Sequence, residues 1–206
     1  ILTIDIGGTK LRTVRFSPEL DRIGRPEYTN ASDVQSPEQL REFILGRTQA
    51  YGGNLIGVGL AVTGTVDTQT GLVYKSPNVR WLDGVDLGTL IRDTLGVPFA
   101  VSNDADSFTL AEAKVGAGRG ARHVIGYTLG TGIGGGIVID GHLHTGSGIG
   151  ANEIGHLCLA IDGPPCTCPS RGCLEAYAAG WAIPRSAAAL RAARDEPVAE
   201  DAIVYS

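Results

Sequence analysis

The sequence has little positive charge and no long apolar run. Lysine occurs only at Lys10, Lys75 and Lys114, and the 206-residue chain carries a net charge of −5 at pH 7. A nucleic-acid surface needs clustered Lys and Arg side chains, so we expect no nucleic-acid partner. No apolar stretch approaches the roughly 20 residues of a membrane span, so we expect no membrane partner.

Methionine is absent, even at position 1, and the first residues carry no targeting signal. The opening "ILTIDIGGTK" lacks a basic segment and contains Asp5, so we expect it not to be a secretory signal peptide. We expect the natural start to lie upstream or to have been removed. With 43% hydrophobic and 19% charged residues, the chain is typical of a globular protein, and we expect it to be cytoplasmic.

Glycine, in contrast, is abundant. The 30 glycines are roughly twice the usual share, and they cluster between apolar runs, which is typical of turns and close backbone contacts. Hydrophobic periodicity predicts strands and helices in alternation. We expect strands at 1–5, 11–16, 55–62 and 99–103, a strand pair within 121–143, and helices at 36–53, 87–97, 106–116 and 173–194, the last interrupted by Pro184.

The first helix has clear end signals. Ser36 is placed to cap its N-terminus, Pro37 suits the first helical position, and Gln39 completes a capping box with Ser36. Gly52 and Gly53 are expected to end the helix. The following apolar strand is of a kind that is covered on both faces.

Strand pairs followed by helix and strand predict an α/β fold with a mixed sheet. We place a domain boundary near residues 103–110, which gives an N-terminal lobe at 1–106 and a second lobe at 107–206. The stretches "TIDIGGTKLRTVRF" and "GYTLGTGIGGGIVID" form a weak internal repeat of strand, Gly/Thr-rich turn and strand.

These two turns are candidate phosphate loops. In "DIGGTK", a strand leads Asp5 into a Gly-Gly turn whose backbone N–H groups can hold phosphate, while the carboxylate can hold Mg²⁺ through water. The alternative is a hairpin turn without a ligand. In "LGTGIGGG" the glycine spacing differs from a dinucleotide fingerprint and a strand follows, so the pair indicates two loops around one nucleotide.

Asn103 and Asp104 follow the strand at 99–103. An ionised carboxylate near a helix start can orient a substrate hydroxyl and accept its proton. The alternative is that Asp104 is an ordinary N-cap, with Asp106 as a competing cap.

All four cysteines lie in "GHLCLAIDGPPCTCPSRGC". His156, Cys166, Cys168 and Cys173 form the pattern H-x9-C-x-C-x4-C, which suits a closed tetrahedral Zn²⁺ site. A disulfide or a catalytic thiol is the alternative, and we interpret Cys158 as a buried apolar residue.

In order along the chain, these motifs resemble the ROK family of bacterial sugar kinases and related repressors. The resemblance covers about residues 1–183 and rests on Asp5–Lys10, Gly57–Gly59 with Gly64, Asn103–Asp104, Leu129–Gly132, Glu153–His156 and Cys166–Glu175. It implies a two-lobed actin-like ATPase fold (ribonuclease H-like) that binds ATP, Mg²⁺ and a sugar between the lobes, together with a structural Zn²⁺.

The resemblance also implies a role for each matching residue. Asp104 would be the catalytic base. The sugar ligands would be Gly64, Asn78, Asn103, Glu153, His156 and Glu175, and the nucleotide and Mg²⁺ ligands would be Asp5, Gly7, Gly8, Thr9, Lys10, Thr131 and Gly132. His156 would contact both zinc and sugar.

Some positions depart from the family pattern. Thr63 replaces a common Pro, Thr65 replaces an Arg of some N-acetylmannosamine kinases, and Asn152 and Pro169 replace usual glycines. Family members have roughly 300 residues, so the second lobe is expected to be incomplete here, without the adenosine contact. We expect a hexose kinase, with glucose as the first candidate sugar, and a homodimer or homotetramer. A sugar-responsive repressor and an inactive sugar-binding relic are the alternatives.

Overall fold

The computed structural model describes residues 1–146 and 150–194. Within these residues the chain forms two compact units, 1–107 with Gly150 and 108–146 with 151–194. The division falls inside helix α3 (Asp104–Val115), which also contains the boundary predicted at residues 106 and 107. Each unit is described by itself. No helix in these ranges is long and apolar enough to cross a membrane.

The first unit is built on a mixed sheet. Its described strands run in the order β3-β2-β1-β4-β7, with β1 (Leu2–Ile6), β2 (Lys10–Phe16), β3 (Arg22–Asn30), β4 (Val58–Val62) and β7 (Phe99–Asn103). β1, β4 and β7 are parallel, whereas β2 and β3 pair antiparallel. The predicted α/β class with a mixed sheet is confirmed.

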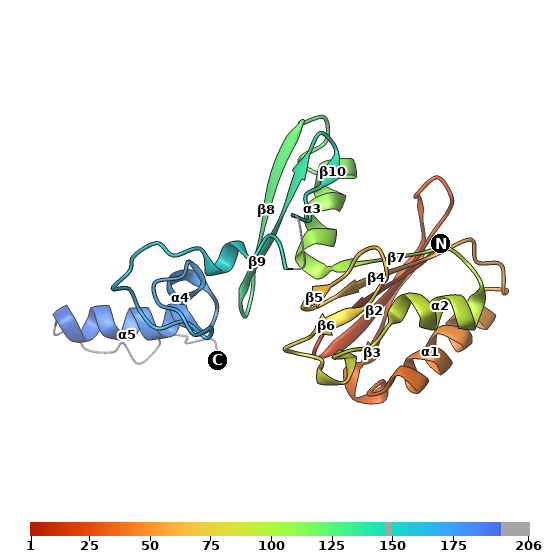
Figure 1. Cartoon of the computed structure of the whole chain (residues 1–206), viewed down its shortest axis with the longest axis horizontal. Coiled ribbons are helices and arrows are strands. Elements are labelled where there is room, and N and C mark those ends of the chain that lie inside the picture. Colours follow the sequence, from red (N-terminus) through yellow and green to blue (C-terminus); the bar gives the residue numbers. More distant parts are fainter. Residues whose placement is uncertain (147–149, 195–206) are drawn as a thin grey trace. The chain divides into compact units, whose positions relative to one another are not determined.

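Two helices cover this sheet. α1 (Pro37–Ala50) and α2 (Leu87–Leu95) lie side by side in Figure 1 and pack on the apolar strands. Smaller elements complete the unit: the hairpin β5 (Thr65–Val66) and β6 (Val73–Lys75), and the short helices η1 (Ala31–Asp33) and η2 (Arg80–Leu82). In β4, Val58, Leu60 and Val62 are buried while Gly59 and Ala61 are half-buried, so only one face of this strand is fully covered within its unit.

The start of α1 shows one prediction that is right and one that is wrong. Ser36 caps the helix by accepting a hydrogen bond from the Gln39 backbone N–H at 3.2 Å, and Pro37 occupies the first helical position. The Gln39 side chain does not return to Ser36 as a capping box requires; it accepts from the Gln35 N–H at 2.7 Å instead. The side chain of Gln39 therefore binds the backbone N–H of the residue before the N-cap, which lies outside the helix.

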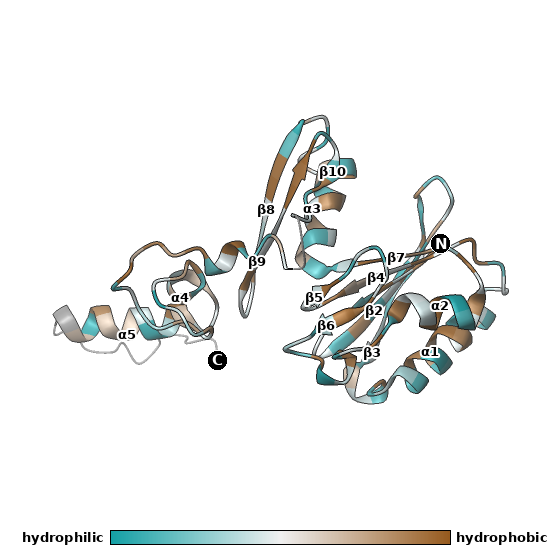
Figure 2. Cartoon of the chain, viewed as in Figure 1, coloured by the Kyte–Doolittle hydropathy of each residue, from teal (hydrophilic) through white to brown (hydrophobic). Residues whose placement is uncertain are grey.

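The second unit contains an antiparallel sheet. Its described strands have the order β10-β9-β8, with β8 (His123–Leu129), β9 (Ile133–Ile139) and β10 (His142–Leu143). In Figure 2 both long strands contain hydrophobic stretches, which alternate with glycine and polar positions. The short helix η3 (Ile154–His156) packs on β9, and the helices α4 (Glu175–Ala178) and α5 (Ala182–Arg194) follow.

The predicted interruption of the last helix at Pro184 is wrong. The chain leaves the helical conformation after Ala178 and resumes it at Ala182, so Pro184 lies in the first turn of α5. Proline is tolerated there because the N–H groups of a first turn have no partner within the helix. The break is associated instead with a bond from the Gly180 N–H to the carbonyl of Gly130, at 2.8 Å.

Candidate functional site

The carboxyl ends of three parallel strands meet at one edge of the first sheet. The register aligns Ile6 of β1 with Val62 of β4, and Val62 with Asn103 of β7. The next residue of each chain segment therefore emerges at the same edge, where open α/β sheets usually bind their ligands. This arrangement positions Thr63 beside Asp104, and the Thr63 hydroxyl donates to Asp104 Oδ2 at 3.4 Å.

Asp104 is a partly buried carboxylate beside a second one. Burial raises its pKa, the negative charge of Asp5 raises it further, and hydrogen bonds from the Ala105 N–H and Thr63 oppose these effects. Burial also raises the pKa of Asp5, against the attraction of Arg12. Two coupled carboxylates form a donor set that suits a hard divalent cation such as Mg²⁺.

Asn103, rather than an aspartate, caps helix α3. Its Oδ1 accepts from the backbone N–H groups of Ala105, at 2.9 Å, and Asp106, at 3.2 Å. Its Nδ2 donates to the carbonyl of Gly64 at 2.9 Å. The alternatives in which Asp104 or Asp106 is the cap are therefore wrong: both lie in the first turn of the helix. Because Asn103 takes the capping role, Asp104 Oδ2 is left with the Thr63 hydroxyl.

Gly64 has a backbone position that other residues cannot share. Its φ is +112°, and a Cβ atom there would lie 2.2 Å from the carbonyl oxygen of Lys75. The close contact brings the end of β6 against the segment that contains Gly64. A side chain at this position would displace the carbonyl that holds Asn103.

The first glycine turn closes a tight hairpin between β1 and β2. The Gly7 N–H donates to the carbonyl of Lys10 at 3.2 Å, and Gly8, Thr9 and Lys10 are exposed. A Cβ on Gly8 would lie 3.1 Å from the carbonyl oxygen of Asn78, so the predicted sugar ligand Asn78 packs directly on this turn. The first unit thus brings the predicted residues Gly8 and Asn78 into contact.

The second glycine turn joins β8 to β9. The Gly130 N–H donates to the carbonyl of Gly132 at 3.0 Å, which leaves Thr131 exposed at the tip. At its end, the Ile133 N–H donates to Glu175 Oε2 at 2.8 Å. A Cβ on Gly132 would lie 2.6 Å from the same oxygen, so the Glu175 carboxylate packs on the turn itself.

Glu175 has a structural partner on each carboxylate oxygen. Besides the Ile133 bond, its Oε1 accepts from the Thr167 hydroxyl at 3.0 Å, and the residue is only 7% exposed. Each oxygen keeps a further lone pair for an external hydroxyl. Its role as a sugar ligand stays a prediction.

Glu153 directly precedes the short helix η3 and His156 is the last residue of that helix, which is held close to β9. A Cβ on Gly155 would lie 1.9 Å from the carbonyl of Ile133, so only glycine allows this contact. Asn152, where the family pattern has glycine, has a φ of +65°, and its Nδ2 donates to the carbonyl of His144 at 2.7 Å. Asn is one of the few other residues that adopt this conformation readily.

The four predicted metal ligands lie together. One ring nitrogen of His156 and the Sγ atoms of Cys166, Cys168 and Cys173 are all within 4.8 Å of one another. Cys166 Sγ is 3.6 Å from His156 Nδ1, and Cys168 Sγ is 3.7 Å from Cys173 Sγ. A tetrahedral ion with Zn–S bonds of about 2.3 Å separates its sulfur ligands by about 3.8 Å. The side chains therefore fit Zn²⁺.

The distance between Cys168 Sγ and Cys173 Sγ does not fit the disulfide alternative. All four cysteines are free, and a disulfide would bring two sulfurs to about 2.05 Å. Burial raises the pKa of Cys166, but hydrogen bonds from Cys168 and His156 outweigh it and lower the value to about 7. Burial and the neighbouring thiols raise the pKa of Cys173 to about 12. A divalent cation supplies the charge that lets all three thiols ionise.

Cys158 differs from its prediction. It is exposed, whereas we expected a buried apolar residue. The backbone of Cys158 forms an antiparallel bridge with that of Cys173, so this residue contributes to the fold through its main chain rather than its side chain.

Two threonines in these sites were not predicted from the sequence to be functional. Thr63 donates to Asp104, and Thr167 donates to Glu175. Thr63 could have been identified from its place directly after a buried strand. Thr167 stands between two metal ligands, but the sequence contains no sign of its partner.

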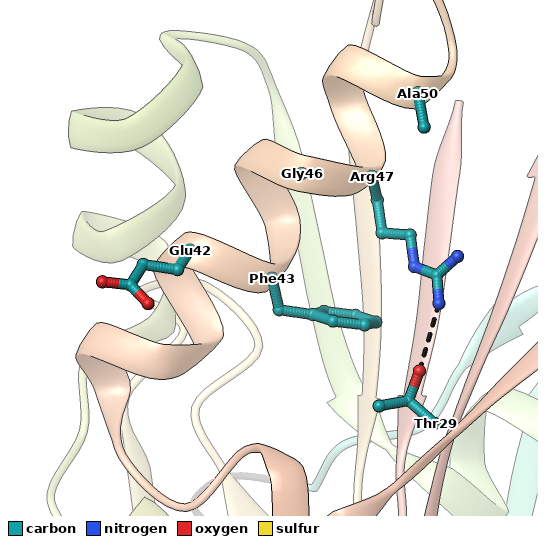
Figure 3. Close-up of a pocket in the computed structure, with 6 residues that line it drawn as sticks. All are labelled: Thr29, Glu42, Phe43, Gly46, Arg47 and Ala50. Atoms are coloured by element: carbon teal, nitrogen blue, oxygen red, sulfur yellow. Dashed lines mark hydrogen bonds between the residues drawn. The ribbon is translucent and has the colours of Figure 1, made fainter.

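A hollow elsewhere in the first unit contains none of the predicted site residues. It measures about 340 Å³ and lies between α1 and β3 (Figure 3), where Arg47 Nη2 donates to the Thr29 hydroxyl at 3.1 Å. Its lining residues are Thr29, Glu42, Phe43, Gly46, Arg47 and Ala50.

Comparison with known proteins agrees with the motifs. The family model described as "ROK family" matches residues 1–204. The glucokinase of Thermotoga maritima is 36% identical over 189 residues, which cover 90% of this chain and 59% of that protein. The xylose repressor of Bacillus subtilis is 34% identical over 149 residues, 72% of this chain and 38% of the repressor.

A solved structure shows the same fold. A ROK family glucokinase from Streptomyces griseus in complex with glucose and AMPPNP has a TM-score of 0.72 and 34% identity, with 95% of this chain and 62% of that one covered. The chain thus spans about 60% of the length of the glucokinases that it matches. The two sheets, each with a glycine turn, the Cys₃His cluster and these similarities together show that the chain belongs to the ROK family.

Proposed function

We propose that the full-length protein containing this chain is an ATP-dependent hexose kinase, with glucose as its first candidate substrate. The observation that carries the proposal is the position of Asp104. It is an ionisable carboxylate at the carboxyl edge of the parallel strands, next to Asp5, in a family whose relatives include glucokinases.

In this proposal Asp104 is the catalytic base. Its Oδ2 accepts the proton of the sugar hydroxyl, which we take to be O6. The sugar oxygen forms a bond to the γ-phosphorus of ATP, and the bond between this phosphorus and the bridging oxygen of ADP breaks. Phosphoryl transfer has a loose transition state, so positioning and charge neutralisation contribute most of the rate. An ionised aspartate is a sufficient base.

The glycine turns would hold the phosphates. Gly8 and Thr9 in the first unit, and Thr131 and Gly132 in the second, present backbone N–H or hydroxyl donors at exposed turns. Such donors bind anionic oxygens without a side-chain charge. When bound near Asp5, Mg²⁺ would neutralise charge on the transferred phosphoryl group.

Sugar recognition is assigned to polar groups that the fold already orients. We propose that Asn103, Gly64 and Asn78 in the first unit, and Glu153, His156 and Glu175 in the second, bind the hydroxyls. A site of this kind discriminates against sugars that lack a hydroxyl, because a polar group that loses water when the sugar binds is then left without a partner. The homodimeric or homotetrameric state stays a prediction.

The metal cluster has a positioning role in this proposal. His156, Cys166, Cys168 and Cys173 would hold a structural Zn²⁺. The ion would close the loop 156–173, with Glu153 three residues before it and Glu175 two residues after it. No open coordination position is needed for chemistry, since four protein ligands complete a tetrahedron.

A sugar-responsive repressor is the second candidate, because a xylose repressor is 34% identical over 72% of the chain. A repressor needs the sugar site but has no use for a base or for phosphate loops. The presence of Asp104 and of both glycine turns therefore favours the kinase, and also disfavours an inactive sugar-binding relic.

An ADP-release assay on the full-length protein tests the proposal. It supplies ATP and Mg²⁺ with glucose, mannose, fructose, N-acetylglucosamine or N-acetylmannosamine in turn. Turnover with one of these hexoses would support the kinase and identify its substrate. If no sugar gives turnover while one of them still raises the melting temperature, the kinase proposal is wrong and a sensor or relic is indicated.

A further inference from the structure

The loop that contains the metal ligands is connected to the second glycine turn through two side chains. Thr167 stands between Cys166 and Cys168, and its hydroxyl donates to Glu175 Oε1 at 3.0 Å. The other oxygen of Glu175 accepts from the Ile133 N–H at 2.8 Å, at the end of the turn. One carboxylate thus joins two segments that lie more than 30 residues apart in sequence.

The geometry gives this carboxylate little freedom. Glu175 is 7% exposed, and its Oε2 lies against Gly132, where a Cβ would be only 2.6 Å away. Glu175 is the first residue of helix α4 and comes two positions after the predicted metal ligand Cys173. A buried carboxylate depends on its hydrogen-bond donors, because each missing donor leaves charge without compensation.

We propose that Thr167 is a positioning residue through which metal binding orders the second glycine turn. A metal ion bound by Cys166 and Cys168 holds the backbone of Thr167 between them. The threonine hydroxyl then fixes Glu175, and Glu175 fixes the Ile133 N–H and the turn at 130–132. The order of this turn therefore depends on the metal even though none of its residues is a metal ligand.

This inference deepens the proposed function, in which Glu175 binds the sugar and the turn binds phosphate, and its consequences for catalysis rest on that proposal. Without the Thr167 hydroxyl, both contacts are predicted to weaken together while the metal stays bound. A residue that only supported the metal would instead change metal affinity first.

The test is hydrogen exchange at Ile133 in the full-length protein, with Zn²⁺ bound and after removal by a chelator. Four proteins are compared: wild type, Thr167→Val, Thr167→Ser, and Thr145→Val as a control at an exposed threonine of the same unit. Valine keeps the shape of threonine and lacks the donor, whereas serine keeps the donor. Zinc content is measured for each protein.

In the wild type, the serine variant and the control, zinc should slow exchange at Ile133 by about tenfold or more, since a hydrogen bond to a charged group changes a local equilibrium by that much. Thr167→Val should bind zinc with normal stoichiometry and lose this response. Its affinity for the sugar substrate should fall by about tenfold.

Two results would overturn the inference: a wild type whose Ile133 exchange ignores zinc, or a Thr167→Val protein that keeps the full wild-type response. The first needs no variant, so it stands even if Thr167→Val fails to fold. The exchange rate at Ile133 and the zinc content can both be measured in a protein that has no kinase activity. A protein that phosphorylates no sugar but shows the coupling would refute only the proposed function, and an active kinase without coupling would refute only this inference.

Discussion

Replacement of Gly64 by alanine tests how the first unit holds Asp104, the proposed catalytic base. The added Cβ would lie 2.2 Å from the carbonyl oxygen of Lys75, whereas real Cβ contacts are essentially never shorter than 3.0 Å. The backbone must therefore move by at least about 0.8 Å. At φ +112° an L-residue is also strained by roughly 1–3 kcal/mol.

These two effects set the expected cost. Overpacking adds about 1–3 kcal/mol, so Gly64→Ala should lower the free energy of unfolding by roughly 2–6 kcal/mol. Gly46→Ala is the matched control. Gly46 lies exposed within α1 with nothing within 4 Å of the added Cβ, so the same substitution should stabilise the protein by about 0.5–1 kcal/mol.

The functional consequence follows from the hydrogen bonds around Gly64. A shift of its carbonyl breaks the bond from Asn103, which caps α3 and stands beside Asp104. Under the proposed function, a displacement near 1 Å should lower kcat by about a hundredfold. Denaturant unfolding and steady-state kinetics measure both effects. A Gly64→Ala protein with the stability and kcat of Gly46→Ala would refute this reasoning.

Three further predictions concern charge and metal. Asp104→Asn should abolish turnover, keep sugar binding, and leave the melting temperature at pH 7 unchanged or higher. A raised pKa means that folding disfavours the ionised form, so the penalty grows as pH rises from the unfolded pKa through the folded pKa and persists above it. A clearly lower melting temperature would contradict this prediction. In the wild type, kcat should decline as pH falls through the raised pKa of Asp104, at a higher pH than for an ordinary aspartate near 3.9, which a pH–rate profile measures. Cys168→Ser should lose zinc and weaken sugar binding, and an unchanged sugar affinity in the zinc-free protein would break the link between the two.

Strong local signals were sufficient for much of the fold and for the metal cluster. The strand at β1, the cap of α1 by Ser36 and the convergence of His156 with three cysteines follow from periodicity, capping chemistry and ligand spacing. β3 was not predicted, because Gly24 and Pro26 argue against a strand. Both are tolerated there because β3 is an edge strand of the described sheet.

Where two segments distant in sequence meet, the sequence was not sufficient. Nothing near Asn103 shows that Gly64 will accept its amide, so the sequence offered only Asp104 and Asp106 as alternative caps of α3. The contact of Gly180 with Gly130 likewise decides where the last helix breaks, against the local signal of Pro184. The partner of Thr167 is known only once Glu175 is placed.

The most direct test of the central claim is sugar-dependent ADP release by the full-length wild type and by Asp104→Asn, with sugar affinity measured on both by calorimetry. The account predicts turnover by the wild type, a loss of at least about a thousandfold in the variant, and similar sugar affinities. A variant that keeps most of the wild-type rate would contradict the role of Asp104. A wild type that binds sugar but releases no ADP would contradict the kinase itself.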